Sequence, residues 1–503
     1  MKILVFIVSY NAENFIRQVL ERIPKDLWEA ADHEIEVLVI DDRSSDQTFR
    51  KVVEYTDQHP EKQIKTLFNP QNQGYGGNQK IGYRYAIQEG FEVVVLLHGD
   101  GQYAPELLPE MFGPIASGQA DVVLGSRMLD RLQALRGKMP VYKWVGNQVL
   151  TTLQNALLGT RLAEFHTGYR AYRVASLAQI PYQANSNYFD FDTDILIQLI
   201  DTGQRIAEIP IPTYYGDEIS HVNGLKYAFK ILAATVRSRI MRLGLLYDPK
   251  FDYDLDSNEF YTFKAGFPSS HQFAIDRVAP NAIILDLGCG PGYMAKALSS
   301  LGASVVSVDR YITPMTRRHS VRSVEADVEK LNFRKLEGRF DVILLMDIIE
   351  HLNEPEKFLA RIREKFGDKA PPEIILTTGN VGFIFVRLGL FLGQFNYGKM
   401  GILDRDHKRL FTFGSMKRLL ESAGFRIIAS QGIPAPFPLA IGDRSLAQFM
   451  LALNRLLITL SRGLFSYQLA FVAYPLANLD HLLADAMSTA REKKEDLQGE
   501  IGP

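Results

Sequence analysis

The sequence has little cysteine and little net charge. Among its 503 residues Cys289 is the single cysteine, which excludes an intrachain disulfide and makes the reducing cytoplasm the simplest setting. Its 56 lysines and arginines nearly balance 58 aspartates and glutamates, so the formal net charge is −2. We therefore expect no nucleic-acid partner, and any affinity for phosphate or membranes must come from local patches.

Long apolar runs are also absent. No uninterrupted stretch reaches the ~18 residues that a membrane-spanning helix needs, and Arg387 and Arg455 interrupt the best candidates. The first residues, MKILVFIVSY, lack the small-residue cleavage site of a signal peptide. We expect a cytoplasmic protein without an integral membrane segment, and peripheral association with the inner face of the membrane is compatible with this pattern.

Two series of alternating strand and helix patterns organise the chain. In the first series, apolar runs typical of strands buried on both faces occupy residues 3–10, 36–42, 91–100 and 121–127. In the second series, the runs occupy residues 282–288, 304–309, 341–347 and 373–379. Such β-α-β order predicts two mostly parallel sheets with right-handed crossovers.

We therefore predict an α/β protein with two domains. The composition changes near residues 251–258, so we assign residues 1–247 to the first domain, 248–268 to a linker and 269–432 to the second domain. The chain then turns proline-rich, and later helical and apolar. We expect residues 433–503 to form a helical extension that ends in a polar tail.

Polar clusters follow two strands of the first series. Asp41 and Asp42 end one strand, and His98, Asp100 and Gln102 lie at the end of another. Ligands of open α/β sheets bind beyond these strand ends. Oxygen ligands there suit the Mg²⁺ or Mn²⁺ that accompanies the diphosphate of a sugar nucleotide. The alternative is that Asp41 and Asp42 only cap the helix that follows.

Six blocks in order resemble the inverting GT-A glycosyltransferases of family 2, typified by dolichyl-phosphate mannose synthases. They are IVSYNAENFI, VLVIDDRSSDQT, NPQNQGYGGNQKIGY, LLHGDGQYAPE, GSR and FHTGYRAYR. The resemblance covers about residues 3–243. The resemblance implies a nucleotide-sugar donor and a lipid-phosphate, glycan or small-molecule acceptor. It implies that Asp100 and Gln102 bind the metal. The donor-site residues that it implies are Ser9, Asn11, Asp41, Asp42, Gly74, Asp100, Arg127 and Arg170.

One position departs from the family pattern. The family usually has Asp-x-Asp, whereas His98 replaces the first acid here. A neutral imidazole binds Mn²⁺ but suits Mg²⁺ less well, so the identity of the metal stays open. His98 is a candidate metal ligand, and the alternative is a histidine that only packs or hydrogen-bonds.

Transfer to a hydroxyl needs a general base, whereas an ionised phosphate acceptor needs none. The candidates are Asp190, Asp192 and Asp194, which would share one face in an extended segment, and we favour Asp192. Solvated or helix-capping carboxylates are the alternative.

A basic helical pattern follows the first series. Lys226, Lys230 and Arg237 fit one side of it, and His221 comes just before it. Such a helix favours anionic lipid surfaces and could hold a polyprenyl-phosphate headgroup, so we predict that His221 and Lys226 contact the acceptor phosphate. A solvated face over the core is the alternative.

The second series opens with ILDLGCGPGYMAKAL, which reads as a strand, a glycine turn and the start of a helix. Gly288, Gly290 and Gly292 allow close approach of a ligand to the backbone. Tyr293 stands where a dinucleotide fingerprint has Gly or Ala, which argues against a nicotinamide cofactor. Asp309 ends the next strand nineteen residues after Gly290, where an acid can accept both ribose hydroxyls.

This half resembles the class I S-adenosylmethionine-dependent methyltransferases of the ubiquinone-biosynthesis type, which have a Rossmann-like fold. The matching blocks are LDLGCGPG, VVSVDR, VEADVEKL, FDVILLMDIIEHLNEPEKFL and HKRLFTFGSMKRLLESAGF. The resemblance covers about residues 269–428. The resemblance implies S-adenosylmethionine as the cofactor. It places Asp347 beside the sulfonium. The other cofactor residues that it implies are Asp286, Gly288, Cys289, Gly290 and Gly292 at the methionine end, Asp309 at the ribose and Asp327 at the adenine.

An oxygen nucleophile in this half would benefit from a base. His351 and His407 are the candidates, and a packing or capping histidine is the alternative for His351. Residues 383–411 are aromatic and apolar and could line an acceptor pocket. Later leucines between residues 446 and 464 recur at helical spacing; we expect that helix to pack on the protein, with membrane-surface binding as the alternative.

Together the patterns predict a bifunctional transferase. One half transfers a sugar in an inverting, metal-dependent reaction, and the other transfers a methyl group to an oxygen, nitrogen or carbon on the same pathway. The alternative is an active methyltransferase fused to a sugar-nucleotide-binding module that no longer turns over.

Overall fold

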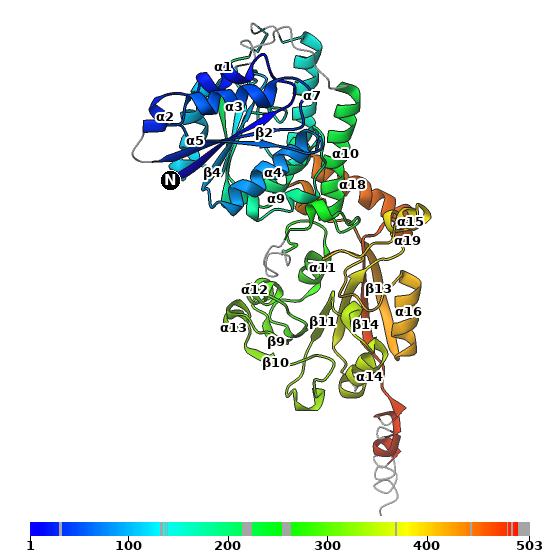
Figure 1. Cartoon of the computed structure of the whole chain (residues 1–503). Coiled ribbons are helices and arrows are strands. Elements are labelled where there is room, and N and C mark those ends of the chain that lie inside the picture. The colour runs from blue at the N-terminus through cyan, green and yellow to red at the C-terminus, as the bar shows by residue number, and fades with distance from the viewer. Residues whose placement is uncertain are drawn as a thin grey trace, which may run out of the picture. The chain divides into compact units, whose positions relative to one another are not determined.

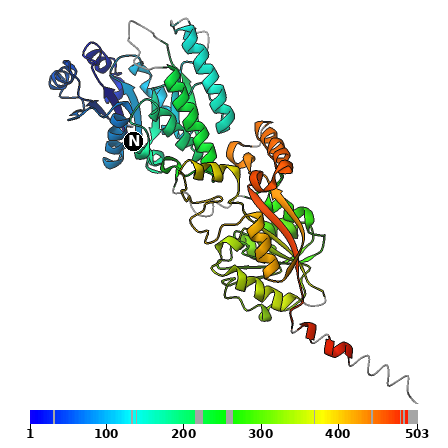
Figure 2. The same cartoon turned by 90° about the vertical axis from the view of Figure 1, so that its right-hand side faces the viewer.

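The computed structural model of the chain divides into two compact units. The first comprises Met1–Met241 and Asp248–Leu255, and the second comprises Arg242–Tyr247 and Asp256–Pro503. The residues that the structure describes are 1–29, 33–130, 134–135, 137, 139–213, 224–253, 263–367, 370–442, 445–479, 481–483 and 486–490. Figures 1 and 2 show the two units from two sides.

The first unit is built on a seven-stranded sheet with the order β3-β2-β1-β4-β6-β5-β7. Its strands pair in parallel except β6, which runs antiparallel to β4 and β5. The strands are β1 (Lys2–Ser9), β2 (Glu34–Asp41), β3 (Ile64–Phe68), β4 (Val93–His98), β5 (Val122–Ser126), β6 (Arg170–Arg173) and β7 (Ile206–Pro210).

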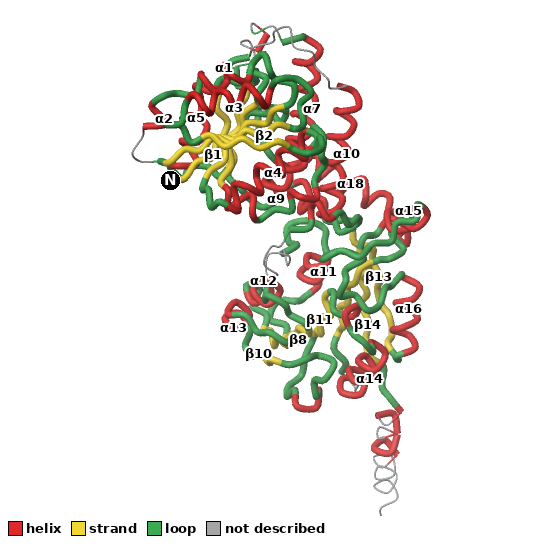
Figure 3. The backbone as a smooth tube through the Cα atoms, in the orientation of Figure 1, coloured by secondary structure: helices red, strands yellow, loops and turns green. Residues whose placement is uncertain are grey.

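Helices cover both faces of this sheet, as the yellow layer between red helices in Figure 3 shows. One face packs against α1 (Ile16–Glu21), α3 (Thr48–Gln58) and α5 (Leu108–Ala116), and the other packs against α4 (Tyr75–Gln88), α8 (Val174–Ala178) and α9 (Phe191–Asp201). Alternate residues of β1 enter the two cores, which explains its continuous apolar run. Two longer helices, α7 (Val141–Leu158) and α10 (Gly224–Arg242), complete the unit.

The second unit has a seven-stranded sheet with the order β10-β9-β8-β11-β12-β14-β13, in which β14 runs antiparallel to both neighbours. Its strands are β8 (Ile283–Leu287), β9 (Ser304–Asp309), β10 (Arg322–Glu325), β11 (Val342–Met346), β12 (Glu373–Gly379), β13 (Phe425–Ile433) and β14 (Gln468–Pro475). Its helices are α11 (Ser270–Arg277), α12 (Tyr293–Ser299), α13 (Pro314–His319), α14 (Pro355–Phe366), α15 (Ile384–Phe391), α16 (Phe413–Ser422), α17 (Phe437–Ile441), α18 (Ser445–Leu460) and α19 (Arg462–Phe465).

The structure draws two boundaries differently from the sequence analysis. Phe251 and Tyr253, which we placed in the linker, pack into a core of the first unit, whereas Leu243 packs into a core of the second. The expected boundary after residue 432 falls within β13, and β14 lies entirely in the predicted helical extension. The short apolar run of β14 is a strand because it fills the gap between β12 and β13, a tertiary pairing that helical spacing cannot reveal.

Among the described residues, no helix is both long enough and apolar enough to cross a bilayer.

Candidate functional site

The first site lies at the carboxyl ends of β1, β2 and β4, the edge where open α/β sheets bind ligands. Ser9 ends β1 opposite Asp41 of β2, and His98 ends β4. The Ser9 hydroxyl and Oδ2 of Asp41 are buried and have no hydrogen-bond partner among the described residues. Burial raises the pKa of Asp41. Two unpartnered buried groups at one edge fit a ligand that brings hydrogen-bond donors, as the prediction for Asp41 requires.

Asp42 and Asn11 hold the loops around this edge. Oδ1 and Oδ2 of Asp42 accept hydrogen bonds from the backbone N–H groups of Gln73 at 2.8 Å and Gly74 at 2.9 Å. Oδ1 of Asn11 accepts from the N–H of Ser45 at 2.9 Å. Gly74 has a φ of 77°, and a side chain there would collide with the carbonyl of another loop, so the turn requires glycine.

The three predicted metal ligands follow β4. Nδ1 of His98 lies 4.0 Å from Oδ2 of Asp100, and Oδ1 of Asp100 accepts from the backbone N–H of Gln102 at 3.0 Å. Burial lowers the pKa of His98, which favours a neutral imidazole. Within the described part of the chain, no three His, Cys, Asp or Glu side chains are grouped so that they could hold a metal ion. A cation here would therefore need further oxygen ligands, such as those of a diphosphate.

A hydrogen-bond chain connects His98 to Asp192, and sequence analysis did not predict its middle member. The hydroxyl of Tyr75 in α4 donates to Oδ2 of Asp192 at 2.9 Å and lies 3.1 Å from Nε2 of His98. Nε2 of Gln79 donates to Oδ1 of Asp192 at 3.1 Å. Because the single hydroxyl proton goes to Asp192, Nε2 of His98 must donate to Tyr75, which leaves Nδ1 as the acceptor nitrogen on the side of Asp100.

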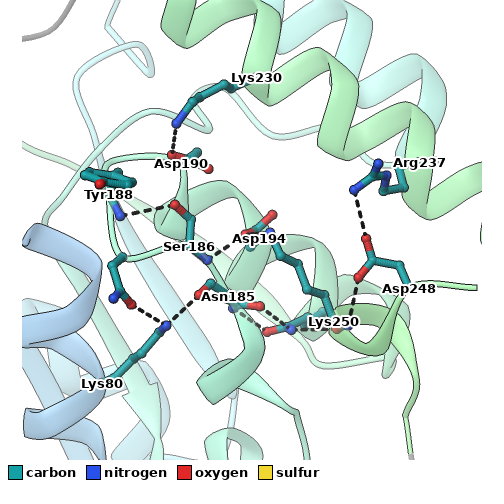
Figure 4. A network of polar contacts seen from close by, with 12 residues as sticks. Lys80, Asn185, Ser186, Tyr188, Asp190, Asp194, Lys230, Arg237, Asp248 and Lys250 are labelled. Carbon is teal, nitrogen blue, oxygen red and sulfur yellow. Dashed lines mark hydrogen bonds and ion pairs between the residues drawn. The ribbon is translucent and has the colours of Figure 1, made fainter.

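The three candidate bases lie in a helix and not in an extended segment. Asp190 precedes α9, and Asp192 and Asp194 are in its first turn. Residues four apart share one side of a helix, and the residue between them points elsewhere. Asp190 pairs with Lys230 at 3.2 Å and Asp194 with Lys250 at 2.8 Å (Figure 4). Of the three, only Asp192 joins the hydrogen-bond chain that leads through Tyr75 to His98.

The two arginines expected at the donor are engaged inside the protein. Arg170 is fully buried, and its Nε, Nη1 and Nη2 donate to the carbonyls of Thr167, Asp192 and Phe165 at 2.7, 2.7 and 2.9 Å. Arg127 forms an ion pair with the buried Glu164. Burial raises the pKa of Glu164, but the interaction with Arg127 outweighs burial, so the net shift of the pKa is downward. Arg170 therefore positions the FHTGYR loop and α9 instead of facing a ligand, because all its nitrogens have backbone partners.

The basic helix pattern forms α10, as the spacing predicts. Lys226 is exposed, Lys230 pairs with Asp190, and Arg237 pairs with Asp248 at 3.3 Å (Figure 4). His221 lies outside the described residues, so its predicted contact with the acceptor phosphate has no structural account. The contact predicted for Lys226 stays a prediction.

The second site lies at the carboxyl end of β8. Gly288, Gly290 and Gly292 all have positive φ, at 78°, 50° and 92°. Side chains at Gly288 and Gly292 would collide with Ile348 and Thr316, whereas nothing lies within 4 Å of a side chain placed at Gly290. The turn is therefore packed against the protein at Gly288 and Gly292 and has open space next to Gly290. A ligand that lies over the backbone needs such a space.

Asp286 and Asp309 flank this turn. Oδ2 of Asp309 accepts from the N–H of Gly290 at 2.8 Å. Oδ2 of Asp286 is buried without a partner among the described residues, and burial together with Asp309 raises the pKa of Asp286 to about 7. Burial also raises the pKa of the Cys289 thiol well above its usual range, so it stays protonated. Asp327 pairs with Arg310 at 3.0 Å.

Asp347 is held from three elements. Its carboxylate accepts from the hydroxyl of Thr377 at 2.7 Å and from Nε2 of Gln468 at 2.8 and 2.9 Å, and it lies 3.6 Å from Nζ of Lys264. Burial raises the pKa of Asp347, but Lys264 and these donors outweigh it, so the net shift is downward. Gln468 belongs to β14, so the misplaced strand also concealed a residue of the site.

The two candidate histidines lie together beside a buried acid. The rings of His351 and His407 are 4.8 Å apart, and Nε2 of His407 lies 4.0 Å from Oε1 of Glu350. Burial and Asp347 raise the pKa of Glu350 to about 8. Sequence analysis missed Glu350, although its place beside His351 in IIEHL was the available signal.

The sheet order and the strand-edge sites define the class of each unit. The first has a GT-A-like fold, and the second has the fold of a class I methyltransferase. The sequence profile described as Glycosyl transferase family 2 matches residues 4–180, and that of a methyltransferase domain matches residues 264–430. The chain belongs to glycosyl transferase family 2 through its first unit, and it joins that domain to a methyltransferase domain. Both belong to families of enzymes, which confirms the predicted fusion.

Three known proteins illustrate these relationships. Undecaprenyl-phosphate mannosyltransferase of Micrococcus luteus is 30% identical over 221 residues, which is 42% of this chain and 83% of that protein. Ubiquinone biosynthesis O-methyltransferase of Dinoroseobacter shibae is 25% identical over 189 residues, 35% of this chain and 75% of that protein. The structure of glucosyl-3-phosphoglycerate synthase from Mycobacterium tuberculosis with Mn²⁺, uridine diphosphate and glucosyl-3-phosphoglycerate is 16% identical to this chain. The match covers 47% of this chain and 78% of that one, with a TM-score of 0.35.

Proposed function

We propose that the chain is a bifunctional transferase. Its first unit transfers a sugar from a nucleotide-sugar donor to a lipid-phosphate or glycan acceptor, with inversion and with Mg²⁺ or Mn²⁺. Its second unit transfers a methyl group from S-adenosylmethionine to an oxygen, or to a nitrogen or carbon, on the same pathway. The observation that carries the sugar-transfer proposal is the edge formed by the carboxyl ends of β1, β2 and β4. There the Ser9 hydroxyl and Oδ2 of Asp41 are buried without a partner among the described residues, and His98 connects through Tyr75 to Asp192.

Each acid of the first site has a distinct task in this proposal. Asp41 accepts a hydrogen bond from the donor's nucleotide through its unpartnered Oδ2. Asp100, with Gln102 and Nδ1 of His98, would hold the cation, which offsets the charge on the leaving diphosphate. Asp192 removes the proton of a hydroxyl acceptor, and Tyr75 and Gln79 orient its carboxylate for that step.

Replacing Asp192 by asparagine tests the class of acceptor. The amide keeps the shape of the side chain but cannot act as a base, so transfer to a hydroxyl should fall by about 10²- to 10⁴-fold while donor binding is unchanged. An ionised phosphate acceptor needs no base, and transfer to it should change less than about tenfold. The measurement is steady-state transfer to a soluble glycan and to a polyprenyl phosphate, and Asp57→Asn, an exposed acid of α3, is the matched control. Equal rates for Asp192→Asn and the control with both acceptors would remove Asp192 from the mechanism.

Replacing His98 by aspartate tests the metal. A second carboxylate suits Mg²⁺ better than an imidazole does, so the variant should be activated by Mg²⁺ at least about as well as by Mn²⁺, whereas the natural protein should prefer Mn²⁺. Mn²⁺ binding followed by electron paramagnetic resonance, with Mg²⁺ as competitor, gives the preference directly. An unchanged preference would mean that His98 only packs and hydrogen-bonds, as it does to Tyr75, and does not bind the metal.

The second unit supplies binding and orientation for methyl transfer. The open face of Gly290 and the unpartnered Oδ2 of Asp286 fit a cofactor whose amino-acid end lies over the turn. S-adenosylmethionine supplies the activated methyl group, and the surrounding residues align the acceptor and exclude water. His351 and His407 would take the proton of an oxygen nucleophile, with Glu350 beside His407.

A lipid-phosphate acceptor would place the protein at a membrane surface. We propose that the chain works in the cytoplasm at the inner face of the membrane, where Lys226 of α10 would meet a lipid phosphate. Mass spectrometry of lipid and glycan extracts with and without the gene should reveal a product that loses both the sugar and the methyl group. Release of nucleoside diphosphate with Mn²⁺ tests turnover itself. Its absence with every sugar nucleotide would instead favour a binding module fused to an active methyltransferase.

A further inference from the structure

The second unit carries an exposed apolar stripe on α18. Five large side chains recur at alternating spacings of three and four residues, so they lie along one side of the helix. All are at least a third exposed, with Phe449 at 64% and Leu460 at 74%. The five are Leu446, Phe449, Leu453, Leu456 and Leu460.

This stripe is not the face by which α18 packs on the protein. Ala447, Leu451 and Asn454 form the buried side. Asn454 accepts from the N–H of Ala435 at 2.9 Å and donates to the carbonyl of Phe465 at 2.8 Å. The helix therefore packs on the protein by one side, as expected, and exposes apolar side chains on the other.

A second apolar segment begins beside α19, the short helix that follows α18. The side chain of Asn380, just before α15, donates to the carbonyl of Gly463 in α19 at 3.1 Å, and Figure 1 shows α15 next to α19. From α15 to residue 397 seven large side chains are exposed, and Phe391 reaches 87%. They are Phe385, Leu388, Leu390, Phe391, Leu392, Phe395 and Tyr397. The surface of a soluble monomeric protein rarely exposes this many large apolar side chains together unless a partner binds there.

The charged residues within these two segments have one sign. Residues 384–400 contain Arg387 and Lys399, and residues 445–467 contain Arg455 and Arg462, with no acid in either segment. The three arginines are exposed. A symmetric contact with a second copy would place like charges opposite one another. An anionic lipid surface instead takes up apolar side chains and attracts the cations that flank them.

We propose that residues 384–397 and the exposed stripe of α18 form a docking surface for an anionic lipid bilayer. The surface belongs to the second unit alone, and it stands whether or not the first unit transfers a sugar to a lipid. It would hold the methyltransferase domain at the membrane by its own contacts.

Co-sedimentation of the full-length protein with vesicles tests this surface. Vesicles of phosphatidylcholine with a quarter phosphatidylglycerol should bind the natural protein, and the triple variant Phe391→Ser, Phe449→Ser and Leu456→Ser should bind at least about tenfold more weakly. The matched control changes three exposed apolar residues elsewhere in the unit, Leu301→Ser, Val321→Ser and Ile428→Ser, and should bind as the natural protein does. Both variants should keep their melting temperature and their affinity for S-adenosylmethionine.

A charge variant separates the two parts of the attraction. Arg455→Gln with Arg462→Gln should weaken binding to the anionic vesicles and leave the weaker binding to pure phosphatidylcholine unchanged. The proposal is overturned if the natural protein does not bind the anionic vesicles, or if the triple variant binds them as the control does. It is also overturned if sedimentation velocity shows a dimer that only the triple variant dissolves, because the occupant would then be a second copy.

Discussion

Replacing Asp100 by asparagine is expected to lower sugar transfer by about 100-fold or more, because several kcal/mol of transition-state stabilisation are lost with the cation. The amide oxygen can still accept from the backbone N–H of Gln102, the bond that Oδ1 makes now, so the loop should keep its conformation. Affinity for Mn²⁺, measured by electron paramagnetic resonance, should fall in parallel. Methyl transfer by the same preparation should be unchanged.

The charge-matched control for this variant is Asp57→Asn. Asp57 is an exposed acid of α3, and its loss changes the net charge by the same amount without touching the strand edge. The assignment of Asp100 to the metal would be contradicted if Asp100→Asn transferred sugar at the rate of the natural protein, or if the control lost as much activity.

Replacing Gly290 by leucine is expected to abolish binding of S-adenosylmethionine, with at least about a 100-fold loss of affinity by calorimetry. The side chain would fill the open space above the turn, where the cofactor is proposed to lie. The positive φ of 50° at this position adds a modest strain of ~1–2 kcal/mol, so the unit should still fold. Sugar transfer by the first unit should be unaffected.

The control for strain is Gly338→Leu. Gly338 has a φ of 100°, also faces open space, and lies in the loop before β11, at the end of the strand opposite the cofactor edge. A φ of 100° is less accessible to leucine than a φ of 50°, so this control should lose at least as much stability as Gly290→Leu and still retain the cofactor. If Gly290→Leu binds S-adenosylmethionine as tightly as this control does, the cofactor does not lie over the turn.

The strands buried on both faces could be predicted from the sequence, and others could not. β1, β4 and β11 are nearly continuous apolar runs, and β8 is apolar apart from Asp286, because each of these strands contributes to two cores. β6 is four residues long and begins and ends with arginine, so neither periodicity nor apolar content marks it. It is a strand because β4 and β5 supply hydrogen-bond partners on both sides. The fold class was predictable from the first kind of strand alone.

The sites divide in the same way. Asp41 and Asp309 end recognisable strands and Asp100 follows one, so chain order alone placed them at a sheet edge. Tyr75 and Gln468 reach the sites through hydrogen bonds to residues more than a hundred positions away, and no local pattern encodes such a contact. Arg170 shows the opposite failure, because a motif arginine suggests a phosphate ligand until its burial and its carbonyl partners are seen.

Calorimetric titration of the full-length protein measures most directly whether it has two separate binding edges. Uridine and guanosine diphosphates in the presence of Mn²⁺ and, separately, S-adenosylmethionine would be titrated into the same preparation. We predict that one of the diphosphates binds once per chain only when the metal is present, and that S-adenosylmethionine binds once per chain regardless of metal. Diphosphate binding that ignores the metal, or binding of NADH in place of S-adenosylmethionine, would contradict the account.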